Sequence, residues 1–464
     1  MIPLTIAEIV GTVGGQLRDV PYPTTTVDAP AASDSREVAP GGLFAAIRGA
    51  RTDGHDHAAE AIARGAAVVL ASRPVGHPAI VVPDGLHALG VLARFVLARL
   101  SPVTIGITGS VGKTTTKDLL AAILEADGTT VATAWSYNNE LGLPLTVLRA
   151  DRQTRYLVLE MGAANKGDIT YLTDIARPRL GVVLNVEPAH VNTFGSLEGI
   201  AAAKAELVEA LPATVRGGVA CLNADDWRVA AMAHHTQAHV IWFGRSGDAA
   251  VRAEDVGLDQ AGRPRFLLRT PVGTAPVQLR VLGEHQVHNA LAAAAVACSL
   301  GITTGQAAQV LSQTPPRAPG RLEVLEALDG VTVVNDAYNA NPASMQAGLR
   351  TLKAMAAGRR TVAVLGEMTG QAEASRERHE EIGRLAAELG VDVLVAVGAG
   401  DPASMAVAAR ARGGQNMLVE TATDQSTALM LLRGLLRPGD VVLVKASSEL
   451  GLATFATRLS KRAQ

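Results

Sequence analysis

The chain has 464 residues, with 42 Lys and Arg against 44 Asp and Glu and a formal net charge of -2. This length exceeds what one hydrophobic core supports and predicts about three domains. The balanced charge excludes a global electrostatic preference for nucleic acid or an anionic membrane. Aromatic residues make up 3% of the chain, which argues against a stacking platform for single-stranded nucleic acid.

The chain also lacks the patterns of secretion and membrane insertion. Cys221 and Cys298 stand in apolar surroundings and predict buried thiols, which suits a reducing cytoplasm. Residues 1–6 show no basic segment followed by a long apolar run, so no signal peptide is predicted. Apolar stretches are interrupted well short of ~20 residues, so no membrane span is expected. We therefore expect a cytoplasmic protein.

Residues 1–100 are predicted to form a small N-terminal α/β domain. Buried strands are predicted at 66–70 and 79–82, and an apolar-striped helix at 86–100. Asp34, Ser35 and Arg36 place a guanidinium beside a small hydroxyl, which suits a phosphate-bearing ligand. An ordinary turn with a surface salt bridge explains these three residues equally well.

A phosphate-binding turn follows. It lies between a β-branched strand at 103–105 and a helix at 115–126. Such a turn directs backbone N–H groups and a helix N-terminus at one place, where Lys113 would reach the terminal phosphates and Thr114 would bind Mg²⁺. The residues expected to bind the nucleotide phosphates are Gly109, Ser110, Val111, Gly112, Lys113, Thr114 and Thr115.

The turn departs from the strict P-loop pattern, because Ile107 stands where that pattern has its first glycine. It fits the shorter form Gly-x-x-Gly-Lys-Thr. A glycine-rich surface turn with a chance lysine is the alternative interpretation.

Residues 101–314 are predicted to form a central, P-loop ATPase-like domain on a parallel sheet. Near-continuous apolar runs predict parallel strands covered on both faces at 156–159, 181–184, 219–222 and 240–243. An antiparallel appendage is predicted from the runs at 265–269 and 277–281. An alanine-rich helix is predicted at 286–299.

Residues 315–464 are predicted to form a C-terminal, Rossmann-like domain after a proline-rich linker at 314–320. The predicted strands alternate with helices, which indicates a second parallel, doubly wound unit. They lie at 331–334, 361–365, 393–397 and 441–444.

Polar residues follow the central strands at the edge where open parallel sheets bind their ligands. Glu160 follows the strand at 156–159 and is a candidate ligand for the Mg²⁺ of a nucleotide. His190 is either a second metal ligand or a hydrogen-bonded loop histidine. Lys204 lies in an alanine-rich predicted helix, and its neighbours alone indicate a surface residue with a snorkelling side chain.

Two asparagine-rich stretches complete the set of candidates. Asn138 and Asn139 come soon after the predicted phosphate-binding helix. Tyr338, Asn339 and Asn341 follow the first strand of the predicted third domain. So many polar groups are costly to bury unpaired, although a loop built from turn residues is the alternative.

Together these motifs resemble the Mur ligase family over essentially the whole chain. The matching residues are Asp34, Ser35, Arg36, Leu43, Phe44, Asp53, Gly54, those at 108–114, Asn138, Asn139, those at 142–144 and 160–162, His190, Lys204, those at 285–289, Arg321 and those at 336–342. Residues 338–342 are similar to the branch that adds a dipeptide, because the branch that adds the third amino acid has an Ala-His-containing sequence there. Asn138 and Asn139 before 142–144 point the same way.

The resemblance implies a three-domain, monomeric ligase that couples ATP hydrolysis to peptide-bond formation. ATP would phosphorylate the terminal carboxylate of UDP-N-acetylmuramoyl-tripeptide to give an acyl phosphate. The amine of D-alanyl-D-alanine would then displace phosphate, giving a UDP-linked pentapeptide precursor of peptidoglycan.

The resemblance also implies roles for single residues. Lys113 would stabilise the transferring phosphoryl group, while Thr114 and Glu160 would hold a first Mg²⁺. His190 and Lys204 would hold a second Mg²⁺, with Lys204 carrying a CO₂-derived carbamate that turns a repelling ammonium into an anionic ligand. Nucleotide contacts are implied for Asn289, Arg321 and Asp336. Substrate contacts are implied for Asp34, Ser35, Arg36, Asn138, Asn139, Tyr338, Asn339 and Asn341.

Two departures and three alternatives qualify this picture. Gln286 follows His285 where the family commonly has Asn, and residues 445–448 read Lys-Ala-Ser-Ser where the family often has Lys-Gly-Ser-Arg, so no phosphate-facing arginine is expected there. The alternatives are the ligase that adds the third amino acid, a regulatory P-loop NTPase and a non-catalytic binding module. The NTPase lacks support because residues 223–226 have no lysine of an Asn-Lys-x-Asp motif.

Overall fold

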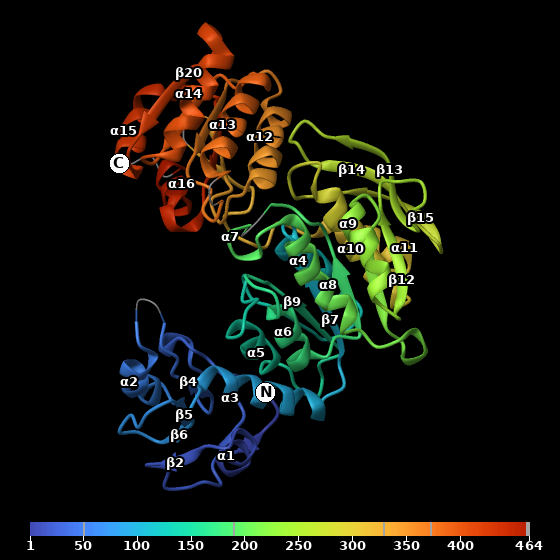
Figure 1. Cartoon of the computed structure of the whole chain (residues 1–464), viewed down its shortest axis with the longest axis vertical. Helices are drawn as coiled ribbons and strands as arrows, with labels where there is room; N and C mark the ends of the chain where they lie inside the picture. Colours follow the sequence, from blue (N-terminus) through green and yellow to red (C-terminus); the bar gives the residue numbers. More distant parts are fainter. Residues whose placement is uncertain (50–51, 189–190, 328–329, 372–373, 461–464) are drawn as a thin grey trace.

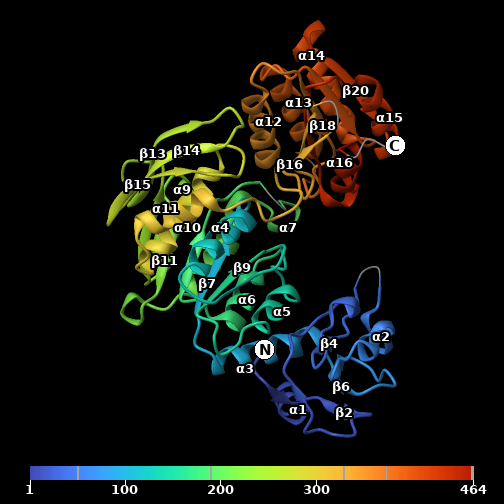
Figure 2. The same cartoon turned by 180° about the vertical axis from the view of Figure 1, so that it is seen from behind.

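The computed structural model describes residues 1–49, 52–188, 191–327, 330–371 and 374–460. Three parts follow one another along the long axis, from the blue N-terminal part through the green and yellow centre to the red C-terminal part (Figure 1). The view from behind shows the same order (Figure 2). Each part has its own mixed or parallel sheet with helices packed against it, which confirms the predicted α/β class.

The N-terminal part contains a four-stranded sheet in the order β2-β6-β5-β4. Its strands are β2 (Gln16–Arg18), β4 (Leu43–Ala45), β5 (Val68–Ala71) and β6 (Ala79–Val81). A short ladder joins β1 (Leu4–Thr5) to β3 (Thr26–Val27). The helices are α1 (Ile6–Val13), α2 (Ala58–Ala63) and α3 (Gly85–Arg99). The predicted strands and the predicted helix of this part are confirmed.

Helix α3 joins the N-terminal part to the centre. Leu89, Leu92 and Val96 of α3 are fully buried in one apolar cluster, which also includes Leu143 and Leu172 of the central part. A shared core of this kind disfavours independent movement of the two parts, because separating them would expose apolar surface.

The central part is a nine-stranded sheet in the order β15-β14-β13-β12-β11-β10-β7-β9-β8. The parallel strands are β7 (Val103–Thr108), β8 (Thr130–Ala132), β9 (Tyr156–Glu160), β10 (Leu180–Val183), β11 (Val219–Asn223), β12 (His239–Gly244) and β13 (Val251–Leu258). The helices are α4 (Lys113–Glu125), α5 (Gly142–Val147), α6 (Asp168–Ala176), α7 (Val191–Phe194), α8 (Leu197–Glu209), α9 (Trp227–Ala231), α10 (Gln286–Ser299) and α11 (Thr304–Gln313).

Both faces of this sheet are covered, as its near-continuous apolar strands predicted. Along β9, Val158 belongs to the core shared with α4 and α10, whereas its neighbours Leu157 and Leu159 belong to the core shared with α6 and α8. Alternate side chains of a strand point to opposite faces, so one apolar run supplies both cores.

An antiparallel appendage ends the central sheet. Strands β14 (Pro264–Thr270) and β15 (Gly273–Gln278) pair antiparallel, as predicted. The predicted strand at 277–281 begins too late, because the hairpin turn already lies between Thr270 and Gly273. Strand β13, which pairs with β14, was missed because it carries charges. One of them, Glu254, pairs with Arg269 of β14 at 2.8 Å.

The C-terminal part is a six-stranded sheet in the order β16-β17-β21-β18-β19-β20. Its strands are β16 (Glu323–Glu326), β17 (Thr332–Asn335), β18 (Thr361–Leu365), β19 (Val393–Val397), β20 (Leu418–Ala422) and β21 (Val441–Lys445), of which β16 is antiparallel. The helices are α12 (Pro342–Ala356), α13 (Ser375–Glu388), α14 (Asp401–Gly413), α15 (Gln425–Leu435) and α16 (Leu452–Ser460). The four predicted strands are confirmed, and the edge strands β16 and β20 were missed.

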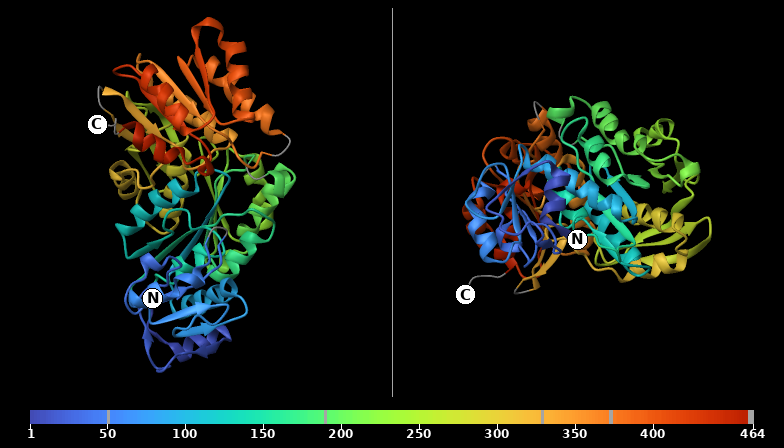
Figure 3. Two further views of the ribbon diagram at one scale, coloured as in Figure 1. Left: turned by 90° about the vertical axis from the view of Figure 1, so that its left-hand side faces the viewer. Right: turned by 90° about the horizontal axis from the view of Figure 1, so that it is seen from below.

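The left view of Figure 3 shows the same order, with the C-terminal part against the central part. Gly262, beside the appendage, lies close to α12 of the C-terminal part. A Cβ added at Gly262 would lie 2.7 Å from Met355. Among the described residues, none of the helices combines the length and hydropathy needed to cross a bilayer.

Candidate active site

A cavity of about 1930 Å³ opens at the carboxyl ends of the central strands and is lined by residues of all three parts. Of the residues predicted to form the site, it is lined by those at 109–115, Asn138, Asn139, Glu160, Lys204, Asn289, Arg321, Asp336, Tyr338, Asn339 and Asn341. His190 lies outside the described residues. Asp34, Ser35 and Arg36 do not line this cavity.

The phosphate-binding turn has the predicted context, between β7 and α4. Gly112 has φ 86° and stands directly before α4, and a Cβ there would lie 2.3 Å from Asn289 Oδ1. Only glycine combines this left-handed conformation with so close an approach. The first N–H groups of α4, from Lys113 onward, have no acceptor within the helix and therefore suit an anion.

Lys113 folds back over the turn. Its Nζ donates to Gly109 O at 2.8 Å. Burial lowers the pKa of Lys113, Glu160 opposes this effect, and the positive charge of Arg321 adds to it. A cation whose charged form is disfavoured by burial gains from an incoming phosphate.

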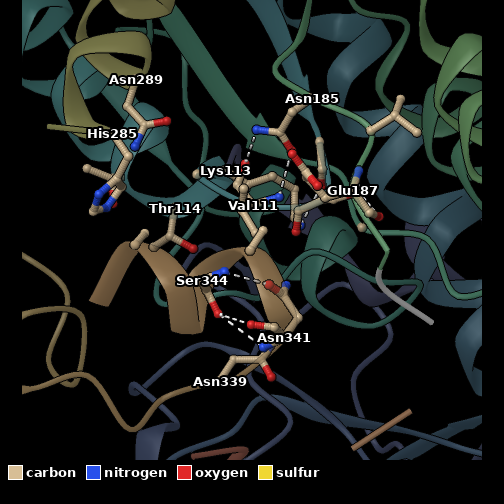
Figure 4. A pocket seen from close by; sticks show the side chains of 18 of the residues that line it. Val111, Lys113, Thr114, Asn185, Glu187, His285, Asn289, Asn339, Asn341 and Ser344 are labelled. Carbon is tan, nitrogen blue, oxygen red and sulfur yellow. Dashed lines mark hydrogen bonds between the residues drawn. The ribbon is translucent and has the colours of Figure 1, made fainter. Parts of the chain in front are cut away.

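Asn185, two residues after β10, holds the turn from the side (Figure 4). Its Oδ1 accepts from Val111 N at 2.9 Å and its Nδ2 donates to Val111 O at 3.1 Å. The N–H of Ser110 donates to Asn185 O at 3.1 Å. Two N–H groups predicted to face phosphate therefore have protein acceptors, and the N–H groups at the start of α4 remain for the ligand.

Glu160, the last residue of β9, lies beside Thr114. The Thr114 hydroxyl donates to Glu160 Oε2 at 2.8 Å and lies 3.1 Å from Ser136 Oγ, while Asn138 Nδ2 donates to Glu160 Oε1 at 2.7 Å. A hydroxyl and a carboxylate in contact are oxygen donors of the kind that Mg²⁺ binds together with phosphate oxygens. Within the described residues, no group of three His, Cys, Asp or Glu side chains could hold a metal by itself.

Lys204 is buried in α8, with 5% of its surface exposed, and lines the cavity. The interpretation of Lys204 as a surface residue is therefore wrong. Burial, and then the nearby charge of Lys113, lower its pKa to about 7. Its immediate neighbours did not distinguish it, because alanines are equally common on exposed helix faces; only the family resemblance identified it.

Asn289 of α10 reaches the turn from the opposite side. Its Nδ2 donates to Gln286 Oε1 at 2.6 Å, and its Oδ1 accepts from Thr116 Oγ1 at 3.3 Å. Gln286, a departure from the family pattern, thus holds the Asn289 amide in place.

The C-terminal part supplies a loop between β17 and α12. The Arg321 guanidinium lies 4.3 Å from the centre of the Tyr338 ring, and its Nη2 donates to Ser136 Oγ at 3.1 Å. Asp336 Oδ2 lies 2.7 Å from Lys445 Nζ. Asn341 and Ser344 lie across the cavity from Lys113 and Thr114 (Figure 4).

Two predicted substrate asparagines accept hydrogen bonds from backbone N–H groups at helix starts. Asn139 Oδ1 accepts from Gly142 N at 3.0 Å at the start of α5, and Asn341 Oδ1 accepts from Ser344 N at 2.9 Å as the N-cap of α12.

The N-terminal triplet forms a turn with a surface salt bridge. Asp34 binds Arg36 at 2.6 Å, and Ser35 Oγ donates to Glu60 Oε2 at 2.8 Å. The hydrogen bonds from Arg36 hold the pKa of Asp34 at about 2.

Sequence reasoning missed three residues of the site: Asn185, Ser136 and Lys445. Asn185 could have been predicted, since it follows a predicted strand at the ligand-binding edge. Ser136 lies two residues before a predicted asparagine, and its role depends on a contact with Arg321, which is remote in sequence. Lys445 was noted only as part of a departure from the family pattern.

Comparisons with known proteins agree with this architecture. Family models match three segments of the chain: "Mur ligase family, catalytic domain" at 32–96, "Mur ligase middle domain" at 107–297 and "Mur ligase, glutamate ligase domain" at 320–448. The UDP-N-acetylmuramoyl-tripeptide--D-alanyl-D-alanine ligase of Mycobacterium tuberculosis is 48% identical, over 99% of this chain and 98% of that protein.

Solved structures give the same result. A crystal structure of MurF from Acinetobacter baumannii is similar with a TM-score of 0.84 and 30% identity, over 99% of each chain. The MurF ligase of Thermotoga maritima in complex with ADP has a TM-score of 0.76 and 31% identity, over 94% of this chain and 99% of that one. Full-length similarity at this level, together with the phosphate-binding turn and the polar residues around it, shows that the chain belongs to the Mur ligase family.

Proposed function

We propose that the protein is an ATP-dependent ligase that joins D-alanyl-D-alanine to UDP-N-acetylmuramoyl-tripeptide in peptidoglycan synthesis. The observation that carries the proposal is one cavity lined by the phosphate-binding turn, Glu160, Lys204 and the Tyr338 loop. The full-length similarity to ligases with this printed activity, at 48% identity, supports the choice of substrates. ATP use is supported by the similar ligase crystallised with ADP.

Different residues of the cavity would serve different steps of the reaction. The N–H groups at the start of α4 would bind the phosphate chain, and Lys113 and Arg321 would stabilise negative charge on the transferring phosphoryl group. The terminal carboxylate of the tripeptide would take the γ-phosphoryl group, and ADP would leave. The dipeptide amine would then attack the acyl carbon, release phosphate and lose a proton.

Mg²⁺ would supply charge neutralisation between the nucleotide and the substrate carboxylate. Thr114 and Glu160 would hold the first ion, because their oxygens are already in contact. A second ion would be held by His190 and by Lys204 as a carbamate. The lowered pKa of Lys204 supports this, since only the neutral amine reacts with CO₂ and a pKa of about 7 leaves much of it neutral at physiological pH.

The carbamate is tested by chemical rescue. Lys204→Ala is expected to be inactive and to recover part of its activity with acetate, which can enter the space of the lost side chain as a carboxylate ligand. Full activity of Lys204→Ala without acetate would contradict a role for Lys204. Inactivity that neither acetate nor another short carboxylate relieves would contradict the carbamate.

The remaining predicted residues are assigned to the substrates. We propose that Asp34, Ser35 and Arg36 bind the UDP moiety on a domain of residues 1–100. Residues 101–314 would bind ATP, with Asn289 beside the adenine. Residues 315–464 would receive the dipeptide, with Asn138, Asn139, Tyr338, Asn339 and Asn341 lining the path between them. Asp336 would reach the nucleotide only after further closure, since its carboxylate is engaged by Lys445.

The product is a cytoplasmic precursor of the cell wall. We therefore place the protein in the cytoplasm and connect its activity with cell shape and division. We also propose that it acts as a monomer, and its balanced charge supports a function without nucleic acid.

A two-substrate ligation assay with mass detection of the UDP-pentapeptide tests the function. D-alanyl-D-alanine with the UDP-tripeptide should give product, whereas diaminopimelate or lysine with the UDP-dipeptide should not. Activity only with a single amino acid would favour the ligase for the third residue. Rapid ATP hydrolysis without either peptide substrate would favour a regulatory NTPase, and Lys113→Ala with full activity would exclude the turn from the mechanism.

A further inference from the structure

Lys445, at the end of β21, is fully buried although it carries a charge, and its burial needs a reason. All three hydrogens of its ammonium have acceptors. Nζ lies 2.7 Å from Asp336 Oδ2, 2.9 Å from Asn339 O and 3.3 Å from Asp336 O. Strands β21 and β17 are parallel neighbours, so their carboxyl ends place Lys445 beside the loop that follows Asn335.

The fold makes room for this lysine at α12. An added Cβ on Gly348 would lie 3.3 Å from Lys445 Cδ and 3.6 Å from Asp336 Oδ2. A buried ion pair with complete hydrogen bonding is retained for geometry more readily than for stability, because desolvation offsets most of its Coulomb energy. Lys445 is therefore expected to fix the geometry of the loop that it contacts.

The loop held by Lys445 contacts the two residues that flank Arg321 in the chain, Gly320 and Leu322. On one side, Gly320 O accepts from Tyr338 N at 3.1 Å. On the other side, Leu322 N donates to Asp336 Oδ1 at 3.1 Å. The Tyr338 ring itself lies under the Arg321 guanidinium, 4.3 Å from it.

Leu322 is held in an unfavourable conformation. Its φ is 50°, in the left-handed region that a bulky residue rarely adopts. Such strain persists only where the surroundings impose it. Here the surroundings are the Asp336 carboxylate on the Leu322 N–H and the apolar cluster that buries the Leu322 side chain.

The strained conformation of Leu322 directs the neighbouring Arg321 side chain into the active site. Arg321 donates to Ser136 Oγ at 3.1 Å, and Ser136 Oγ lies 3.1 Å from the Thr114 hydroxyl of the phosphate-binding turn. A polar path thus runs from Lys445 through Asp336, Leu322 and Arg321 to Ser136 and Thr114.

We infer that Lys445 is a positioning residue, which holds the 336–341 loop and the left-handed Leu322 so that Arg321 faces the nucleotide phosphates. The inference rests on the proposed function for the identity of the nucleotide. It makes the Asp336 carboxylate a part of the scaffold in this arrangement, and it assigns the phosphate-facing charge of the C-terminal part to Arg321.

A double-mutant cycle between Lys445 and Arg321 tests this, because a positioning residue has no effect of its own once its target is gone. Lys445→Met should lower kcat/KM for ATP at least about tenfold, as should Arg321→Ala. The double variant should lie within about threefold of Arg321→Ala alone. Effects that multiply, or full activity of Lys445→Met, would overturn the inference.

Three further measurements keep the result interpretable. Lys353→Met is the matched control, since Lys353 also donates to a backbone carbonyl, Gly390 O at 3.1 Å, but on the exposed side of the same part. Thermal unfolding checks that Lys445→Met folds; if it does not, Asp336→Asn, which keeps the side-chain shape, enters the same cycle with the same expectation. ATP affinity, measured by calorimetry on each full-length variant, should show the same non-additivity. This arm is independent of ligation, so a failure of the wild type to form the pentapeptide would count against the proposed function and not against the positioning role.

Discussion

Lys204 brings an ionisable group to a place where its charge is unfavourable. Its folded-state pKa of about 7 lies below the ordinary 10.5, so between these values the unfolded chain binds more protons than the folded chain. Stability of the wild type should therefore rise with pH across this window, and the penalty for the charged lysine should be complete below pH 7. The same burial that costs stability makes the amine available for reaction with CO₂.

The first prediction concerns the free energy of unfolding of Lys204→Met. In CO₂-free and Mg²⁺-free buffer, this variant should be more stable than the wild type by on the order of 3–5 kcal/mol below pH 7. The difference should shrink as the pH rises towards 10.5. Chemical denaturation at several pH values measures it, with the exposed Lys353→Met as the control. A difference that stays constant with pH would show that the Lys204 amine titrates normally.

Asn185 acts on the backbone of the phosphate-binding turn and not on the ligand. Its amide both accepts from and donates to Val111, which a carboxylate cannot do. Asn185→Asp should raise the KM for ATP at least about tenfold, because the new charge repels both Val111 O and phosphate. Asn185→Ala should be affected less, since it loses the two bonds without adding a charge. Steady-state kinetics compares the two, and equal effects would assign the loss to the missing bonds alone.

At the scale of elements, helix α12 shows how one residue can serve the fold and the site. Asn341 caps the helix through Ser344 N, and Pro342 follows at the first helical position. These are ordinary signals of a helix start. The same asparagine lines the cavity, so loss of activity on substitution has two explanations.

Replacing Asn341 by two different residues separates its capping role from a role in substrate binding. Asn341→Ala should cost about 1 kcal/mol of stability because the cap is lost, whereas Asn341→Ser should cost only a few tenths because serine also caps. If Asn341 also binds substrate, Asn341→Ser should lose ligation activity while its unfolding midpoint stays close to that of the wild type. An active Asn341→Ser would leave Asn341 with the capping role alone.

The elements that the sequence predicts correctly are those whose side chains carry the physical cause. Buried parallel strands such as β9 and β18 are mostly apolar, and α10 begins and ends at the predicted residues. Strands β13, β16 and β20 lie at or near sheet edges, where charged residues such as Glu254 satisfy both solvent and a cross-strand partner. Strands β13 and β16 pair with the strands that directly follow them, so they were missed because their charged residues interrupt the apolar pattern and not because their partners are distant.

The residues of the candidate site also divide into those predictable from local sequence and those whose roles depend on distant contacts. Lys113, Thr114 and Glu160 follow from a turn and a strand end, both of which are local. Ser136 and Lys445 take their roles from contacts across domains, with Arg321 and Asp336. Lys204 was identified through family resemblance alone, because burial is decided by what packs over a helix.

At the scale of the whole molecule, the linker between the central and C-terminal parts is fixed at one end. Arg317 binds Glu125 of α4 with two hydrogen bonds, of 3.0 Å and 2.7 Å. Pro315 and Pro316 stiffen the chain before it, whereas Gly320 follows with φ 70°. Rotation of the C-terminal part is therefore expected at 318–320, next to Arg321, and the ion pair keeps that hinge beside the helix that begins at Lys113.

The last prediction is that this ion pair controls domain geometry more than stability. Both partners are partly exposed, so Glu125→Arg should lower the free energy of unfolding by no more than about 1 kcal/mol. It should nevertheless free the linker, because Arg317 would then face a like charge. We expect faster proteolysis at 314–320 and a wider distribution of dimensions in small-angle scattering. The exchanged pair, Glu125→Arg with Arg317→Glu, should restore both, since the bonded geometry is available again with the charges reversed. A double variant that behaves like Glu125→Arg would show that the linker is held by its prolines and not by this pair.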